Sequence, residues 1–260
     1  MSLAARSVSV RLGGRLILDD VSLICDSQQT TALIGPNGAG KSTLLRTLAG
    51  EIGASDGEVL VDRLPITQLS AVALAGRRAV MTQSSEIVFD FTVEEVLSLG
   101  MISDRLRPAE RQAAIERVAR DSDIRHLQSR SYNTLSGGEK QRVQFARALL
   151  QIRPAAGDDT DQAPYLLLDE PTSSLDLSHE LMLLEAVTRE ASRGVGVLIV
   201  IHDLNLAARF ADQIALMQDG RIMAVGAPQE VLDNQRLSDV YRTPVRVEHH
   251  QDLDRLVVYT

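Results

Sequence analysis

Residues 35–43 constrain the fold of this chain more than any other stretch. They read Gly35, Pro36, Asn37, Gly38, Ala39, Gly40, Lys41, Ser42 and Thr43, which matches the pattern of a phosphate-binding loop. A short apolar run at residues 31–34 precedes the loop, and a leucine-rich stretch at 42–49 follows it before Gly50. This order predicts a strand, a glycine-rich loop and a helix.

The residue types of this loop suit a nucleoside triphosphate. Glycines let the backbone wrap around phosphate oxygens, and the successive amides and the helix N-terminus stabilise the anion. Lys41 can reach the terminal phosphates, and the Ser42 hydroxyl can bind Mg²⁺. We therefore expect a nucleoside triphosphate and Mg²⁺ as the ligands of this loop.

Two carboxylates, Asp169 and Glu170, follow the apolar run at residues 165–168. Ligands of open α/β sheets bind beyond the carboxyl ends of the strands, so the pair is expected near the phosphate loop. Asp169 suits the Mg²⁺ shell, and Glu170 is placed to orient or deprotonate a water that attacks the γ-phosphate. The alternative is an acidic pair that caps the turn before Pro171.

The remaining pattern predicts an α/β fold with a P-loop core of mainly parallel sheet. Residues 165–168 and 195–201 are almost entirely apolar, as parallel strands covered on both faces are, and the helical stretch 178–191 lies between them. Antiparallel pairs are expected at 8–12 with 16–18, at 58–62 after a turn at Asp56 and Gly57, and at 214–225. Helical patterns at 92–99, 108–120 and 138–150 predict an inserted α-helical subdomain.

Composition limits the classes of protein to consider. The chain has 260 residues and 44% hydrophobic content, enough for one large domain or two closely packed subdomains. No apolar run reaches the roughly 18 residues that span a bilayer, and the first residues do not resemble a signal peptide. A net charge of −8 argues against general nucleic-acid binding. The single cysteine, Cys25, is expected to be a core thiol, and His249 and His250 a solvated tail.

The segment 135–141 reads Leu-Ser-Gly-Gly-Glu-Lys-Gln and carries the second anion-binding signal. Ser136 and Glu139 on their own form a capping box, and an amphipathic helix after it is ordinary. Gly137 and Gly138, however, leave amides bare at a helix start, in a chain that already has a phosphate loop. The combination resembles the ATP-binding subunit of an ABC transporter, and the resemblance covers nearly all of the chain.

That resemblance implies further site residues. Gln83 would be the glutamine that senses Mg²⁺ and the attacking water and faces the membrane partner. Ser136, Gly137 and Gly138 would contact ATP bound to a second chain, and Ser174 to Asp176 would link the two sites. His202 would contact the γ-phosphate. Leu12 stands where such proteins usually carry an aromatic residue that stacks on adenine, so weaker base selectivity is expected.

The resemblance also implies the organisation and partners. Residues 1–83 and 151–225 would form the nucleotide-binding core, 84–150 the helical subdomain and 226–260 a C-terminal extension. The chain would act as a homodimer under two transmembrane permease subunits, at the cytoplasmic face of the inner membrane, and indirectly with a periplasmic substrate-binding protein. Nucleic acid would not be a partner.

The tail residues 226–232, 240–241 and 245–247 resemble those of ATPases of importers for iron chelates, haem and cobalamin. Within that group, residues 89–96 and a polar insertion at 151–164 look most like ATPases of haem importers. No residue of this chain would contact haem. ATPases of siderophore or cobalamin importers are the alternative. An exporter ATPase, or a soluble ABC ATPase that works on ribosomes or DNA, is a more distant one, because those soluble proteins usually carry two cassettes or a long coiled coil.

Overall fold

A six-stranded central sheet organises the molecule. The computed structural model describes residues 1–83, 87–102, 107–153 and 163–260. The strand order is β10-β9-β3-β8-β7-β6, and only the edge strand β10 runs antiparallel to its neighbour. The strands are β3 (Thr30–Ile34), β6 (Arg78–Met81), β7 (Tyr165–Asp169), β8 (Gly196–Val200), β9 (Gln213–Gln218) and β10 (Arg221–Gly226).

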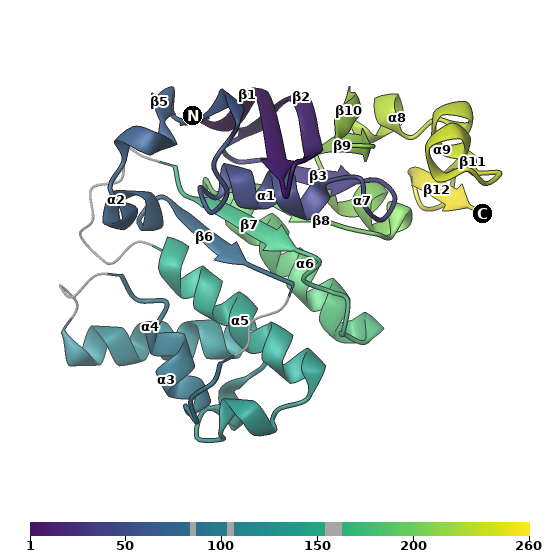
Figure 1. Cartoon of the computed structure of the whole chain (residues 1–260). Helices are drawn as coiled ribbons and strands as arrows, with labels where there is room; N and C mark the ends of the chain where they lie inside the picture. The colour runs from purple at the N-terminus through teal and green to yellow at the C-terminus, as the bar shows by residue number, and fades with distance from the viewer. Residues whose placement is uncertain (84–86, 103–106, 154–162) are drawn as a thin grey trace.

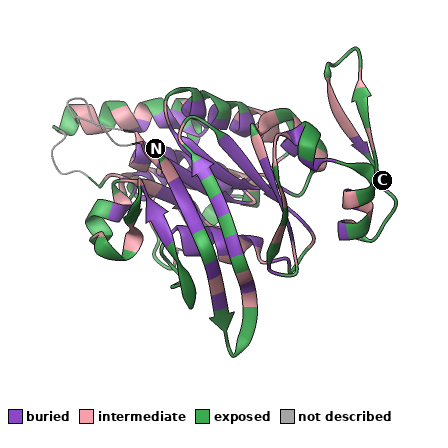
Figure 2. Cartoon of the chain, turned by 90° about the horizontal axis from the view of Figure 1, so that it is seen from above, coloured by how far each residue is buried: buried purple, intermediate pink, exposed green. Residues whose placement is uncertain are grey.

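The middle strands of this sheet are buried on both faces. Every residue of β3, β7 and β8 is buried, as their nearly continuous apolar sequences predict (Figure 2). Side chains alternate between two hydrophobic cores: Leu166 and Leu168 of β7 enter one, and Tyr165 and Leu167 enter the other. The sheet is therefore the shared wall of two cores.

An antiparallel sheet of order β2-β1-β4-β5 covers one core together with α1 (Figure 1). Its strands are β1 (Ser2–Leu12), β2 (Arg15–Asp26), β4 (Asp56–Val61) and β5 (Leu64–Pro65), and the helix is α1 (Lys41–Leu48). The prediction of a turn at Asp56 and Gly57 was wrong, because both residues belong to β4. Gly57 has φ +75°, and a Cβ there would lie 2.2 Å from Ser7 O, so the residue makes a close approach to β1.

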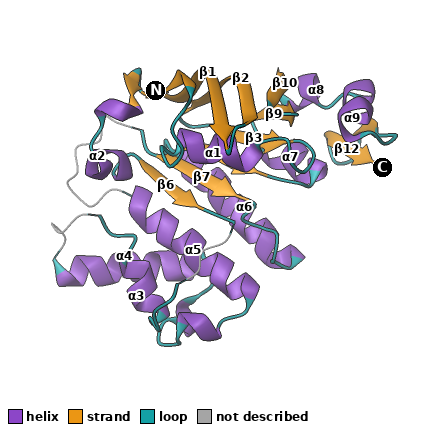
Figure 3. Cartoon of the chain, in the orientation of Figure 1, coloured by secondary structure: helices purple, strands orange, loops and turns teal. Residues whose placement is uncertain are grey.

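The other core lies under a group of helices far from the β1–β2 pair (Figures 1 and 3). The helices are α3 (Val93–Ser98), α4 (Pro108–Asp121), α5 (Gly137–Ile152) and α6 (Leu177–Ser192), with single turns η2 (Arg125–Leu127) and η3 (Tyr132–Thr134). Helix α3 starts at a capping box of Thr92 and Glu95. Helix α5 ends at Ile152, two residues beyond the expected end of the helical region, and most of the expected insertion lies outside the described residues.

The last part of the chain packs beside α7 (Leu204–Phe210). It contains α8 (Pro228–Val231), α9 (Asn234–Tyr241), β11 (Arg246–His250) and β12 (Arg255–Tyr259), and the short elements η1 (Ile66–Gln68) and α2 (Ala71–Ala75) complete the fold. Asn205 of α7 exchanges two hydrogen bonds with the Val258 backbone, at 2.8 and 3.1 Å. The expectation that His249 and His250 form a solvated tail was wrong, because both pair with β12 and His250 is half-buried.

The predicted fold class is confirmed in its main features: a mainly parallel sheet, an N-terminal antiparallel sheet and an inserted helical region. Cys25 is a free thiol in the core, and burial raises its pKa to about 12. Within the described ranges, no helix has both the length and the apolar character to cross a membrane.

Candidate functional site

Four neighbouring parallel strands end at one place, and each delivers a predicted site residue there. Strand β3 leads into the phosphate loop, β8 ends shortly before His202, β7 ends at Asp169 before Glu170, and β6 ends shortly before Gln83. These strands are adjacent in the order β3-β8-β7-β6. The sheet therefore brings together residues that are up to 167 positions apart in the sequence.

The phosphate loop needs glycine at two close approaches. Gly35 has φ +142°, and a Cβ there would lie 2.1 Å from the carbonyl oxygen of Met217. Gly40 has φ +100°, and its Cβ would lie 2.9 Å from the Leu18 side chain. Larger residues at either position would push the loop away from the sheet and from β2.

Lys41 is held inside the loop that it is expected to serve. Its Nζ donates hydrogen bonds to Gly35 O at 2.8 Å and to Pro36 O at 3.0 Å, and the residue is only 6% exposed. Burial lowers the pKa of the ammonium, and the negative charges of Glu170 and Asp169 oppose that shift. The ammonium lies in a cradle of carbonyl oxygens, and a phosphate oxygen could replace them.

Ser42 and Asp169 meet across the site, where Ser42 Oγ donates a hydrogen bond of 3.0 Å to Asp169 Oδ1. Asp169 is 4% exposed, and burial raises the pKa of its carboxyl group, although the Ser42 hydrogen bond acts in the opposite direction. A buried carboxylate beside a hydroxyl is a pair of hard oxygen ligands, and a divalent cation would stabilise its charge. The two residues therefore fit Mg²⁺.

Glu170 holds both of the other predicted catalytic residues. Gln83 Nε2 donates to Glu170 Oε2 at 2.7 Å, and His202 Nε2 lies 2.5 Å from Glu170 Oε1. Glu170 itself has φ +48°, an uncommon conformation for a residue other than glycine, and directly follows strand β7. The carboxylate is thus aimed by backbone and side-chain contacts, which suits a residue that must orient a water.

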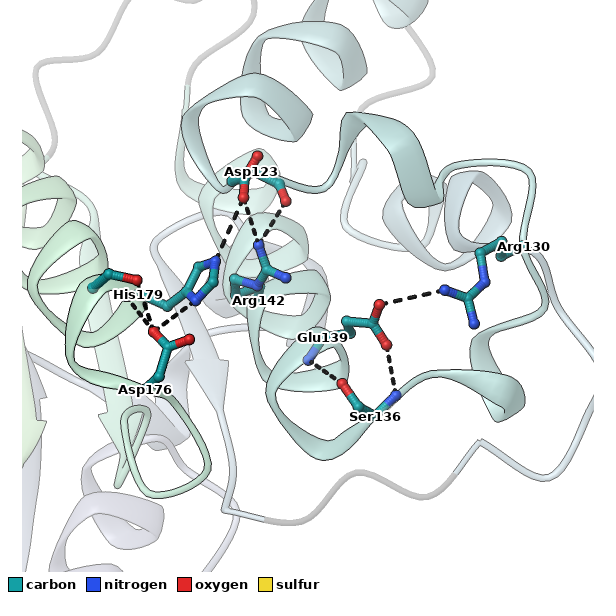
Figure 4. A network of polar contacts seen from close by, with 8 residues as sticks. Asp123, Arg130, Ser136, Glu139, Arg142, Asp176 and His179 are labelled. Carbon is teal, nitrogen blue, oxygen red and sulfur yellow. Dashed lines mark hydrogen bonds and ion pairs between the residues drawn. The ribbon is translucent and has the colours of Figure 1, made fainter.

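Ser136, Gly137 and Gly138 lie at the start of α5, on a different part of the chain. Ser136 and Glu139 form the capping box that the sequence suggested: Glu139 N donates to Ser136 Oγ at 3.3 Å and Ser136 N to Glu139 Oε2 at 2.7 Å (Figure 4). Across the described part of the chain, no hydrogen bond or ion pair joins this helix start to the phosphate loop. The structure leaves these residues separate from the phosphate loop of the same chain.

Gln141 connects the helix start to the segment after Glu170, a role that the sequence analysis missed. Its Nε2 donates to Ser173 Oγ at 2.9 Å, and its Oε1 accepts from Ser174 N at 3.0 Å. Gly138 approaches the same segment, because a Cβ on it would lie 2.9 Å from Ser174 O. The sequence signal was available, since Gln141 closes the seven-residue motif, but only the fold shows its partners.

Tyr241 is a second residue that the sequence analysis did not place in the site. Burial raises the pKa of Tyr241, on helix α9, to about 12, and the nearby backbone of Gly35 acts in the opposite direction. Gly35 therefore lies close to the C-terminal helix α9, while its carbonyl accepts from Lys41. No local sequence pattern could have indicated a contact between residues so far apart.

Leu12 ends strand β1 and is 44% exposed.

Comparison with known proteins gives consistent results at the level of sequence and fold. A family model described as "ABC transporter" matches residues 18–173. A hemin import ATP-binding protein HmuV from Pseudomonas fluorescens is 44% identical over 96% of each chain, and one from Hahella chejuensis is 43% identical over 98% of each. A solved structure described as the ATP binding subunit of an ABC transporter has a TM-score of 0.80 and 24% identity, and it covers 93% of this chain and 98% of its own.

Proposed function

This chain belongs to the ABC transporter family, and we propose that it is the ATP-hydrolysing subunit of a bacterial haem importer. The family match and the resemblance to hemin import ATP-binding proteins over nearly the full chain support this proposal. The single observation that carries the hydrolytic part is the position of Glu170, which is held by Gln83 and His202 at the end of β7.

The phosphate loop and the carboxylates Asp169 and Glu170 have different roles in ATP hydrolysis. Backbone amides of residues 35–43 and the α1 N-terminus bind the phosphates, and Lys41 exchanges its carbonyl partners for the terminal phosphate oxygens. Ser42 and Asp169 would hold Mg²⁺, which neutralises charge on the phosphates. Glu170 orients the attacking water and accepts its proton, while His202 and Gln83 keep the carboxylate aligned.

The separation of Ser136 from the phosphate loop supports a homodimer. Gly137 and Gly138 leave bare amides at the start of α5, and this anion site is not used by the phosphate loop of its own chain. Leu177, beside the Ser174 to Asp176 segment, is 69% exposed, which suits a surface that a second chain covers. Two chains in head-to-tail order would each complete the ATP site of the other.

A groove beside Gln83 supports contact with a membrane partner. Ile87, Val88 and Gln141 line it together with Gln83, and the neighbouring Val88 and Phe89 are 87% and 71% exposed. Exposed apolar side chains next to a hydrolytic glutamine suit a segment of a permease subunit that responds to ATP. The chain would then be a peripheral protein at the cytoplasmic face of the inner membrane.

Haem selection would rest with the permease and a periplasmic binding protein. Among the residues that the structure describes, no group of three His, Cys, Asp or Glu side chains is arranged to hold a metal ion. The assignment of haem to this chain therefore depends on its similarity to the hemin import proteins. ATPases of siderophore and cobalamin importers remain the alternative cargo classes.

Copurification and cargo-stimulated hydrolysis test the function. We expect the chain to copurify with a permease and its ATPase activity in that complex to rise when binding protein loaded with haem is added. Stimulation by a ferric siderophore or by cobalamin would show that haem is the wrong cargo. ATPase activity that no permease changes would contradict the importer function.

Mixed dimers test the shared site. Ser136→Arg in one chain should impair the ATP site that carries the partner's Lys41, while the variant chain's own loop continues to bind ATP. Damage limited to the variant chain's own nucleotide would exclude the trans arrangement. Lys140→Arg, on the same helix, serves as a charge-conserving control.

A further inference from the structure

Helix α6 begins at Asp176, and this residue also holds the side chain of His179. Asp176 Oδ1 accepts hydrogen bonds from His179 N at 2.9 Å and from Ser178 Oγ at 2.8 Å, and it lies 2.8 Å from His179 Nδ1 (Figure 4). Hydrogen bonds from the His179 backbone and from the Ser178 and His179 side chains lower the pKa of Asp176 to about 2. Because the carboxylate can only accept, Nδ1 of His179 carries a proton.

The other ring nitrogen of His179 faces the helical region. His179 Nε2 lies 3.5 Å from Asp123 Oδ2, in the turn after α4. Arg142 of α5 donates from Nη1 to the same carboxylate oxygen at 3.0 Å and to Asp123 O at 2.7 Å, and its side chain is only 9% exposed. We call the set Asp176, His179, Asp123 and Arg142 the His179 clip.

The clip joins two segments that the proposed dimer would present to the second chain's ATP. Asp176 ends the segment that starts at Ser174, and Arg142 lies on α5, which begins at Ser136. Gln141 already ties the start of α5 to Ser173 and Ser174. His179 adds a contact through a different side of the helical region, so the angle between α5 and α6 is fixed at two places and not at one.

Both ring nitrogens of His179 face carboxylate oxygens, which can only accept hydrogen bonds. A hydrogen on Nε2 can therefore be donated to Asp123. The charged groups that face the ring are Asp176 at the start of α6, Asp123 after α4, and Arg142 of α5, whose guanidinium shares the Asp123 carboxylate.

A second polar contact farther along α6 does not depend on a histidine. Arg153, directly after α5, donates to Glu190 of α6 at 2.7 Å and to Asp121 of α4 at 2.8 Å. The Glu190 side chain is 3% exposed. Residues 179 and 190 lie on the same helix about 16 Å apart, at 1.5 Å per residue. The helical region is thus attached to α6 near both ends of this helix.

Resting on the proposed function, we propose that His179 is a positioning residue that holds the Ser136 helix start and the Ser174 to Asp176 segment in register for the ATP of the second chain. It acts through Asp123 and touches no nucleotide.

ATP-driven association of full-length chains tests the proposal. In a Glu170→Gln background, His179→Gln should weaken dimer formation by about two- to fivefold, the range expected for one exposed ion pair. Binding of a fluorescent ATP analogue to the single chain should not change. Asp123→Asn should cause at least the same loss, because it also removes the ion pair with Arg142, and the double variant should lose no more than Asp123→Asn alone. His126→Gln, at an exposed histidine of η2, is the matched control.

A distance measurement tests the clip without nucleotide. Spin labels at Arg120→Cys and Glu185→Cys report the separation of α4 and α6, because the native Cys25 is buried and stays unlabelled. We expect His179→Gln to broaden the distance distribution. An unchanged distribution, or equal dimer formation by the parent and His179→Gln chains, would overturn the proposal. Failure of the parent itself to associate in ATP would overturn the dimer as well, so the two failures are distinguishable.

Discussion

The side-chain amide of Gln83 donates a 2.7 Å hydrogen bond to Glu170, so the expected sensor of the nucleotide already touches the expected general base. His202 occupies the other carboxylate oxygen at 2.5 Å. An attacking water must therefore share Glu170 with these two side chains, or take the place of one of them. Small movements of Gln83, which lines the groove proposed for the permease, would then change how Glu170 holds water.

Glu170→Gln should lower the ATP hydrolysis rate by about 10²- to 10⁴-fold, because an amide cannot accept the proton of the attacking water. Binding of ATP should stay within about twofold of the parent, since Glu170 does not belong to the phosphate loop. Single-turnover phosphate release and nucleotide titration measure the two quantities. Near-normal turnover would remove Glu170 from its assigned role, and Glu180→Gln on α6 is the matched control.

Asp169→Asn should stabilise the nucleotide-free chain while it abolishes Mg²⁺-dependent hydrolysis. Burial raises the Asp169 pKa, so the folded chain holds this proton more tightly than the unfolded chain does. The stability from this group is complete below the unfolded pKa and is lost as pH rises through the higher folded pKa. At neutral pH the charged Asp169 carboxylate therefore destabilises the folded chain. Asparagine carries no charge, so the melting temperature of the variant should rise by roughly 2 °C.

Thermal unfolding at several pH values measures this gain, which should shrink in acid. Asp252→Asn, at an exposed position, is the control and should leave the melting temperature unchanged. A lower melting temperature for Asp169→Asn at neutral pH would show that the Ser42 hydrogen bond outweighs the burial of the charge.

Leu12→Tyr should tighten ATP binding by about fivefold if Leu12 covers the adenine, because a ring adds a stacking energy of order 1 kcal/mol. The parent chain should discriminate weakly between ATP and GTP. Leu16→Tyr is the matched control, since Leu16 has nearly the same exposure, 42% against 44%, on the facing strand. Equal effects of the two substitutions, or strong base discrimination by the parent, would contradict the placement of Leu12.

Tyr241→Phe should raise the KM for ATP by about two- to tenfold with little change in melting temperature, because it removes a buried hydroxyl beside the Gly35 backbone. The carbonyl of Gly35 accepts from Lys41, so a loosened Gly35 also misplaces the ammonium. Steady-state kinetics of the full chain measures the change. Tyr259→Phe, at a 46% exposed tyrosine, is the control, and an unchanged KM would limit Tyr241 to packing.

The local sequence pattern was enough to predict much of the site. The site residues in question directly follow strands whose apolar sequences are easy to recognise. The phosphate loop follows β3, and Asp169 and Glu170 follow β7, so their chemistry could be predicted once the apolar runs were assigned. The bonds of Glu170 to Gln83 and His202 required the strand order, which the sequence does not state. The family resemblance named both residues but not their common partner.

The contacts that sequence reasoning missed are all long-range or run against a local rule. Tyr241 lies close to Gly35 across more than two hundred positions, and His179 of α6 reaches Asp123 in the turn after α4. Asp56 and Gly57 have the composition of a hairpin turn, yet Asp56 pairs with Ser9 of β1, and Gly57 lies at the adjoining register shift, where it lets β4 pass close to Ser7. Composition indicates which conformations a residue can adopt, and tertiary packing selects among them.

The parallel pairing of β3 with β8 has a consequence during synthesis on the ribosome. Thr30 pairs with Val197, so β3 leaves the ribosome well before its partner exists. At typical translation rates the delay is roughly 10 to 30 s, during which an apolar strand has no neighbour on that side. The nascent N-terminal part therefore presents an aggregation-prone edge until β8 emerges, and chaperones or slow-codon pauses near residue 200 would act on its yield.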